Sequence, residues 1–106
     1  MKSGQFLQIL QSRCKLRGQR FVVSAIQNGD CEARLGMAVG KKIIPQAVDR
    51  NYFKRQIRAV YHPVSSRLHG FDIVVRLRCT YPKSVARQAR EELAGLLTAV
   101  ERCRES

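Results

Sequence analysis

Residues 36–61 read GMAVGKKIIPQAVDRNYFKRQIRAVY and decide the fold that we expect for this chain. The stretch begins in the alternating pattern of a strand, passes through a basic turn, and continues with helical periodicity from residue 47 to residue 61. Pro45 is hard to place inside a helix, so it sets a turn just before that helix. The stretch therefore predicts a strand, a turn and a helix in direct succession.

The predicted helix 47–61 has two chemically different faces. One face is expected to pack on a sheet and carries Phe53, Ile57 and Val60. The other face repeats cations at helical spacing, with one amide among them: Arg50, Asn51, Lys54, Arg55 and Arg58. Like charges four residues apart repel each other, and solvated helix faces usually mix the two signs. The unmixed cations therefore predict a face that binds a polyanion.

Four further segments complete the expected fold. They are strands at residues 21–27 and 71–78, a short helix at 6–10, and a final helix at 84–103 capped by Ser84. A third strand, 33–39, belongs to the opening stretch. Asn28-Gly29 favours a tight turn, so we expect strands 21–27 and 33–39 to form a hairpin. Strand 33–39, helix 47–61 and strand 71–78 then make one β-α-β crossover. The order helix, strand, strand, helix, strand, helix predicts an α+β fold, a two-layer sandwich on a small mixed sheet.

The net charge restricts the classes of partner. The chain has 106 residues, the length of one domain, which we expect to span residues 1–106. Lys and Arg number 20 and Asp and Glu number 8, which gives a net charge of +12. Such a surface repels itself unless a polyanion such as RNA neutralises it. We find neither an apolar run of the ~20 residues that a membrane span needs nor a signal peptide, so we expect a cytoplasmic protein without a membrane partner.

The side chains that usually carry catalysis or bind metals are not grouped in the sequence. Cys14, Cys31, Cys79 and Cys103 show no CxxC spacing, so we expect four reduced thiols rather than a zinc site or a disulfide framework. The two histidines lie in a polar loop without neighbouring cysteine or carboxylate clusters. No nucleophile elbow or HExxH motif is present. We therefore predict no catalytic residue and no metal site, which disfavours a stand-alone nuclease.

Binding through charge is the remaining function. Lys41 and Lys42 extend the cationic face of helix 47–61, and together these cations would neutralise phosphates and release counterions. Single-stranded RNA also needs aromatic surfaces on which bases stack. The candidates are Phe6, Phe21, Tyr52 and Tyr61, although such aromatic residues are more often core residues than stacking surfaces.

Three segments, in this order and spacing, resemble the bacterial ribonuclease P protein component. They are LGMAVGKK at residues 35–42, AVDRNYFKRQIR at 47–58 and GFDIVV at 70–75. The resemblance implies a ribonucleoprotein endoribonuclease that removes the 5′ leader of precursor tRNA. It implies that a ribonuclease P RNA, with Mg²⁺ bound mainly by that RNA, performs the chemistry, and that no small molecule is the substrate. It also implies a left-handed β-α-β crossover, whereas the general rule favours right-handed ones.

The resemblance also assigns site residues. Those implied to contact RNA are Lys41, Lys42, Arg50, Asn51, Lys54, Arg55 and Arg58. Those implied to lie at the leader cleft are Phe6, Leu10, Phe21 and Ser24. Three positions depart from the family pattern, because Tyr52 replaces an arginine and Leu10 and Ser24 replace aromatic residues. The alternative from a different class is a structural RNA-binding protein, of ribosomal or assembly-factor type, without a role in processing.

Overall fold

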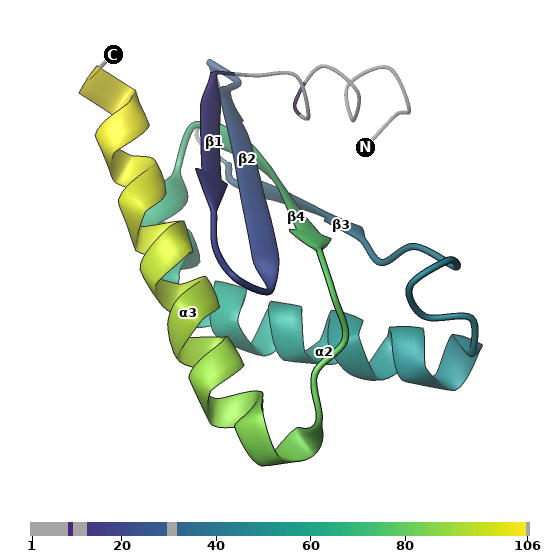
Figure 1. Cartoon of the computed structure of the whole chain (residues 1–106). Coiled ribbons are helices and arrows are strands. Elements are labelled where there is room, and N and C mark those ends of the chain that lie inside the picture. Colours follow the sequence, from purple (N-terminus) through teal and green to yellow (C-terminus); the bar gives the residue numbers. More distant parts are fainter. Residues whose placement is uncertain (1–8, 10–12, 30–31, 106) are drawn as a thin grey trace.

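The structure is a computed structural model and describes residues 9, 13–29 and 32–105 (Figure 1). Four strands and two α-helices make up most of it. They are β1 (Cys14–Arg17), β2 (Phe21–Gln27), β3 (Arg34–Ala38), α2 (Ala47–Val64), β4 (Phe71–Leu77) and α3 (Ala86–Ala99). Short 3-10 helices follow α2, precede α3 and follow α3: η1 (Ser65–Leu68), η2 (Lys83–Val85) and η3 (Val100–Glu105). This mixed composition confirms the predicted α+β class. The predicted helix 6–10 lies outside the described residues, apart from Ile9.

The strands form one sheet in the order β1-β2-β4-β3. The predicted hairpin between strands 21–27 and 33–39 is therefore wrong, because β4 lies between β2 and β3. β2 pairs antiparallel with β4 on one side and with β1 on the other, so the hairpin in the sheet joins β1 to β2. Gly29 has a positive φ of 70°, so the chain does turn there. The strand that follows, β3, pairs with the edge of β4 that faces away from β2.

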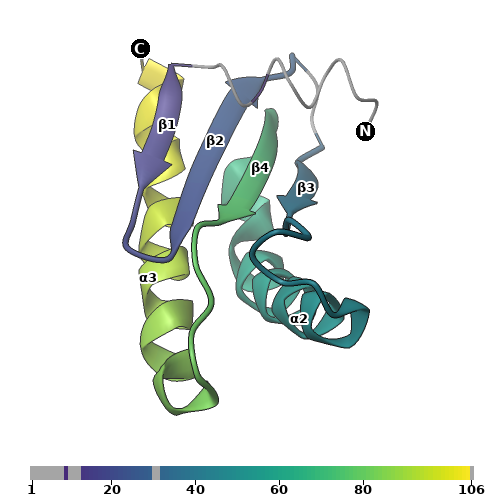
Figure 2. The same cartoon turned by 45° about the vertical axis from the view of Figure 1, so that its right-hand side comes forward.

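The β-α-β crossover is confirmed by the parallel pairing of β3 with β4, whose connection contains α2. Its left-handedness remains an implication of the family resemblance. Figures 1 and 2 show α2 and α3 crossing each other beside the sheet, which gives two layers. Residues 80–83 of the connection from β4 to α3 line a recess together with the loop before α2 and its first turns, so residues just before α3 lie near the start of α2.

The helices bury the apolar side chains that the patterns predicted. Phe53, Ile57 and Val60 of α2 are buried, as are Leu93 and Leu97 of α3. From the sheet, alternate residues enter the same core: Phe21, Val23, Ala25, Phe71, Ile73, Val75 and Leu77. The other face of the central strands is also buried, at Val22, Ser24, Asp72 and Val74. Ile9 is buried too, with 1% of its surface exposed.

Three predicted helix boundaries need correction. One is the end of the predicted helix 84–103, because α3 ends at Ala99 and the 3-10 helix η3 follows it. Helix α2 does not end at Tyr61 but continues to Val64, with Pro63 in its last turn. Pro63 has no N–H to donate to the Ala59 carbonyl, so it removes one helical hydrogen bond, near the end of the helix rather than in its middle. The helix then ends with the Ser65 hydroxyl donating to the His62 carbonyl at 2.8 Å. Ser84 does not cap α3. It lies inside η2, and Val85 precedes α3 without a side-chain cap.

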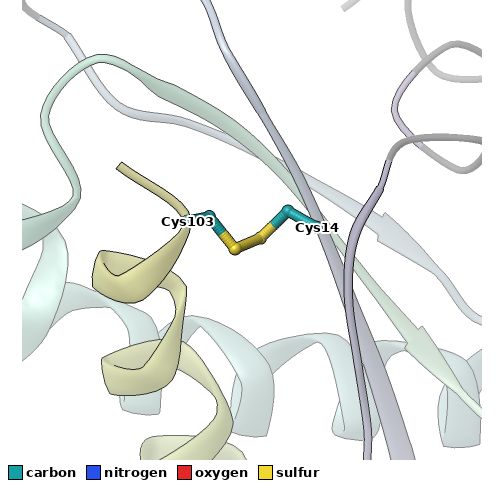
Figure 3. The surroundings of a disulfide bond; sticks show 2 residues. All are labelled: Cys14 and Cys103. Carbon is teal, nitrogen blue, oxygen red and sulfur yellow. A yellow bond between two sulfur atoms is a disulfide. The ribbon is translucent and has the colours of Figure 1, made fainter. Parts of the chain in front are cut away.

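A disulfide bond joins Cys14 of β1 to Cys103 of η3, so the prediction of four reduced thiols is wrong (Figure 3). The two Cα atoms are 5.9 Å apart although the residues are separated by 89 positions. The packing of α3 beside β1 brings Cys14 and Cys103 together. Their spacing in the sequence does not indicate that they pair. Cys79 is a free, exposed cysteine.

The β1–β2 turn is held by Glu92 of α3. One carboxylate oxygen of Glu92 accepts the backbone N–H groups of Arg20 and Phe21, at 2.8 and 3.1 Å, and the other accepts Arg20 Nη1 at 3.0 Å. Gly18 belongs to the same turn, and a Cβ there would lie 2.5 Å from the Glu92 carboxylate. Glycine therefore permits this close approach between the turn and α3.

Among the described residues, no helix is long and apolar enough to cross a membrane.

Candidate nucleic-acid interface

The exposed face of α2 contains a shallow surface depression. It is lined by Val48, Asn51, Lys54, Arg55 and Arg58. Four of these are predicted RNA-binding residues, and the helix brings them together because they recur at intervals of three and four positions. The depression has cations on its walls and no acid among its lining residues. Val48, the fifth lining residue, is 77% exposed and adds an apolar side chain to the lining.

Arg50 has a different position from the other predicted cations. Its Nη1 atom donates hydrogen bonds to the carbonyl oxygens of Ile44 and Pro45, at 3.0 and 2.9 Å. The side chain is half-buried and does not line the depression. At 100° per residue, Arg50 falls between the directions of Ile57 and Tyr61, which are buried. Arg50 therefore holds the preceding loop to α2, and it lies apart from Asn51, Lys54, Arg55 and Arg58 of the predicted face.

Lys41 and Lys42 lie in the loop that Arg50 holds. Both lysines are exposed. The Ile44 N–H donates to the Gly40 carbonyl at 2.9 Å and closes the turn that contains them. Ile44 is itself buried, which anchors the end of the turn in the core. The loop thus carries two exposed lysines shortly before the first turn of α2.

The predicted leader-contacting residues do not share one surface. Phe21 points into the helix-covered core, where 1% of it is exposed and its ring meets that of Tyr81 edge to face at 6.1 Å. Ser24 lies three residues later and therefore on the opposite face of β2. Phe21 is thus unavailable for stacking on RNA in this structure, because its ring fills the core. Phe6 and Leu10 lie outside the described residues.

The sheet face that carries Ser24 has features that the sequence patterns did not single out. The register pairs Lys15 with Ser24, and Arg17 and Arg76 both with Val22, so these three exposed cations share that face. The Ser24 hydroxyl is buried without a hydrogen-bond partner in the described part of the chain. The basic character of residues 13–20 was the available sequence signal, but only the register shows on which face Lys15 and Arg17 lie.

Asp72 terminates this face with a compact polar cluster. Its carboxylate accepts Arg34 Nε and Nη2 at 2.7 and 3.0 Å and Asn28 Nδ2 at 2.8 Å. A two-point guanidinium contact compensates the burial of the carboxylate, which is only 8% exposed. The ion pair between Arg34 and Asp72 thereby joins β3 to β4.

Within the described residues, no group of three or more His, Cys, Asp or Glu side chains is placed to hold a metal ion.

These features define a class of protein: a small, strongly basic α+β domain whose crossover helix presents a cationic face. The comparisons with known proteins are specific. The family model described as Ribonuclease P matches residues 1–101. The ribonuclease P protein component of Ralstonia pickettii is 35% identical, covering 95% of this chain and 77% of the relative. The chain belongs to the ribonuclease P protein family, and it is the protein subunit of a ribonucleoprotein endoribonuclease that matures the 5′ ends of tRNA.

Solved structures agree with this assignment. The RNase P protein from Thermotoga maritima, solved in complex with 1-(4-fluorophenyl)-2-thiourea, aligns with a TM-score of 0.72 and 32% identity, covering 88% of this chain and 91% of that one. A Staphylococcus aureus RNase P protein mutant with defective mRNA degradation activity aligns with a TM-score of 0.78 and 28% identity, covering 95% and 86%. The fold is therefore that of the family along most of the chain.

Proposed function

We propose that this protein binds the RNA subunit of ribonuclease P through the exposed face of α2 and the turn before it. The residues that make the contacts are Lys41, Lys42, Asn51, Lys54, Arg55 and Arg58. The observation that carries the proposal is the depression on α2, whose walls combine three cations and an amide without an acid. Arginine binds phosphate oxygens with two parallel hydrogen bonds, lysine acts as a point charge, and Asn51 contacts sugar or base.

Arg50 acts mainly by positioning in this proposal. By donating to the carbonyls of Ile44 and Pro45, it fixes the end of the loop that carries Lys41 and Lys42 at the start of α2. Its second terminal nitrogen, Nη2, leaves a donor for RNA as well.

The 5′ leader of precursor tRNA is assigned to the sheet face that carries Ser24. Lys15, Arg17 and Arg76 are exposed on this face and supply charge for the leader phosphates, whereas Ser24 itself is buried, with 1% of its surface exposed. Phe6 and Leu10 keep the leader-contacting role that the resemblance implies, whereas Phe21 supports this face from the core side. Because the exposed side chains of this face are cations and position 24 carries no aromatic ring, we expect phosphate contacts rather than base stacking there.

The remaining parts of the proposal follow from a division of labour between protein and RNA. The chain acts as one RNA-binding domain, Mg²⁺ is bound mainly by the RNA, and the RNA performs the hydrolysis. The protein's partners are then ribonuclease P RNA and precursor tRNA, and its place of action is the cytoplasm, where tRNA precursors are made in bacteria.

Salt-dependent binding to ribonuclease P RNA tests the proposal. Lys54→Ala/Arg58→Ala removes two cations from the depression, and Arg102→Ala is a control, since Arg102 is exposed on η3 at another place. Each lost phosphate contact should lower the slope of log affinity against log salt by about 0.7–0.9. The double variant should therefore bind more weakly with a flatter slope, and Arg102→Ala should match the wild type. Equal slopes in all three proteins would refute the basic face as an RNA-binding surface.

A further inference from the structure

A second recess lies on another side of α2, away from the depression. It is formed by the loop before α2, the first turns of α2, and the connection from β4 to α3. We call it the aromatic groove. Its lining residues are mostly apolar or aromatic: Ile43, Ile44, Pro45, Asp49, Tyr52, Phe53, Thr80, Tyr81, Pro82 and Lys83. Ile43 is 38% exposed at its opening, so an apolar surface meets solvent there.

A series of edge-to-face ring contacts makes this groove firm. The rings of Tyr52 and Phe53 are 5.2 Å apart, and those of Phe53 and Tyr81 are 5.0 Å apart. Tyr81 in turn meets Phe21 of the core. Phe53 and Tyr81 are buried, whereas Tyr52 is half-buried and presents its ring at the surface. The groove is therefore preformed, since its wall continues directly into the hydrophobic core.

Two cations lie along the line where α3 meets α2. Lys83 Nζ sits 5.5 Å from the centre of the Tyr52 ring, a cation–π contact. One turn further along α2, Gln56 accepts a hydrogen bond from Arg90 Nη1 at 3.0 Å. Residues 79–90 contain Lys83, Arg87 and Arg90 and no acid. Asp49 is the one acid among the groove-lining residues, so the positive charge gathers on the α3 side.

Tyr81, which also lines the aromatic groove, has a buried hydroxyl group that is not hydrogen-bonded to any described residue. Burial, with a smaller contribution from the charge of Tyr52, raises the pKa of Tyr81 to about 12. A neutral, unpaired hydroxyl in an apolar setting is costly, and a bound group with an acceptor atom would relieve that cost.

We propose that the aromatic groove takes one unpaired nucleobase of the RNA that lies on the basic face of α2, with the flanking phosphates at Lys83 and Arg90. The proposal rests on the proposed function, because the groove and the depression occupy neighbouring sides of one helix. Nucleobases stack against aromatic rings and offer edge acceptors, and their phosphates need cations at the rim. The net charge of +12 favours this occupant over an apolar or basic peptide.

Tyr52 is the specificity element of this arrangement. It stands within the cationic helix but contributes a ring instead of a charge, and it lies between the groove and the exposed side of α2. Because of this ring, RNA bound at α2 would contact the protein through a base as well as through its phosphates.

Fluorescence anisotropy with a labelled ten-nucleotide single-stranded RNA, and with the same oligonucleotide carrying abasic positions, tests the proposal. Tyr52→Leu keeps an apolar side chain and removes the ring, and Tyr52→Phe keeps the ring. Tyr52→Leu should weaken binding of the intact RNA about tenfold and leave the abasic one unchanged. Tyr52→Phe should bind like the wild type. Lys83→Ala/Arg90→Ala should weaken both oligonucleotides and lower the salt slope by about 1.4, whereas Arg102→Ala should not.

The outcomes separate this inference from the proposed function. Equal binding of the intact RNA by Tyr52→Leu and wild type would overturn the base-binding groove. If Lys54→Ala/Arg58→Ala still weakened the same RNA, the basic face would stand and only the groove would fall. If the basic-face variant also bound normally, both proposals would fail. Circular dichroism of each variant verifies that the fold is retained.

Discussion

Arg50 reaches back from the first turn of α2 to the carbonyl oxygen of Ile44, which lies 3.0 Å from its Nη1 atom. A second acceptor, the Pro45 carbonyl, lies 2.9 Å from the same atom. Arg50, by spacing the first cation of the predicted face, thus supports the loop before α2. Arg50 therefore differs from the cations that line the depression, because it supports the loop and they are the residues that we propose to bind RNA.

Arg50→Ala should therefore lower the free energy of unfolding by about 1–2 kcal/mol, because two carbonyls lose a charged donor. Arg58→Ala should change it by less than about 0.5 kcal/mol, since Arg58 is exposed. Urea unfolding followed by circular dichroism measures both values. Identical unfolding midpoints for the two variants would contradict the supporting role of Arg50.

The bond between Cys14 and Cys103 should stabilise the chain strongly. It closes a loop of 89 positions, and the chain-entropy account gives about 4–5 kcal/mol for a loop of that size. Cys14→Ser should lower the urea midpoint under oxidising conditions, and reductant should lower that of the wild type to a similar value. Cys79→Ser, at the free cysteine, is the control and should respond to reductant like the wild type. A wild-type midpoint that is insensitive to reductant would count against the bond.

Glu92 should be the most important acid for stability in α3. Glu92→Ala leaves the N–H groups of Arg20 and Phe21 without their acceptor, which should cost about 2–3 kcal/mol. Glu91→Ala is the matched control, since Glu91 is 67% exposed and pairs only with Arg87 at the surface. Thermal unfolding compares the two. Similar melting temperatures would show that the turn does not depend on Glu92.

The raised pKa of Tyr81, about 12, should make stability fall at high pH. The folded state favours the protonated hydroxyl, so its contribution is fully present below pH 10 and is lost as the pH rises from about 10 to about 12. Tyr81→Phe should therefore lose less stability than the wild type between pH 9 and pH 11. At pH 7 it should be as stable or up to about 1 kcal/mol more stable, because an unpartnered hydroxyl is removed. Parallel pH profiles would disprove this assignment.

The periodic parts of the fold could be predicted from the sequence. The apolar spacing of Phe53, Ile57 and Val60 gave the buried face of α2, and the alternation in residues 71–77 gave β4. The β-α-β crossover followed from their order. These features depend on neighbours a few positions apart, which a single sequence contains.

Long-range relationships could not be predicted in the same way. Asn28-Gly29 does make a turn, but the strand that pairs with β2 comes from residues 71–77, which no local signal indicates. β1 has only four residues with two cations among them, so it resembled a basic arm rather than a strand. The bond between Cys14 and Cys103 depends on how α3 packs.

The candidate site shows the same division. The spacing of Asn51, Lys54, Arg55 and Arg58 was sufficient to group them on one face. The roles of Arg50 and Phe21 needed the loop and the sheet face, respectively, to be placed in three dimensions. The aromatic groove combines residues 43–45, 49–53 and 80–83, and only the tertiary structure brings these segments together.

The central claim is that this chain supports cleavage by a catalytic RNA, and reconstitution tests it most directly. Precursor tRNA is incubated with a bacterial ribonuclease P RNA at physiological Mg²⁺, with the wild-type protein, with Lys54→Ala/Arg58→Ala, or without protein, and a further reaction contains the protein alone. We expect correct 5′ cleavage to be stimulated by the wild-type protein, less by the double variant, and no cleavage by the protein alone. Absence of stimulation, together with tight association with ribosomes, would contradict the account and favour a structural RNA-binding protein.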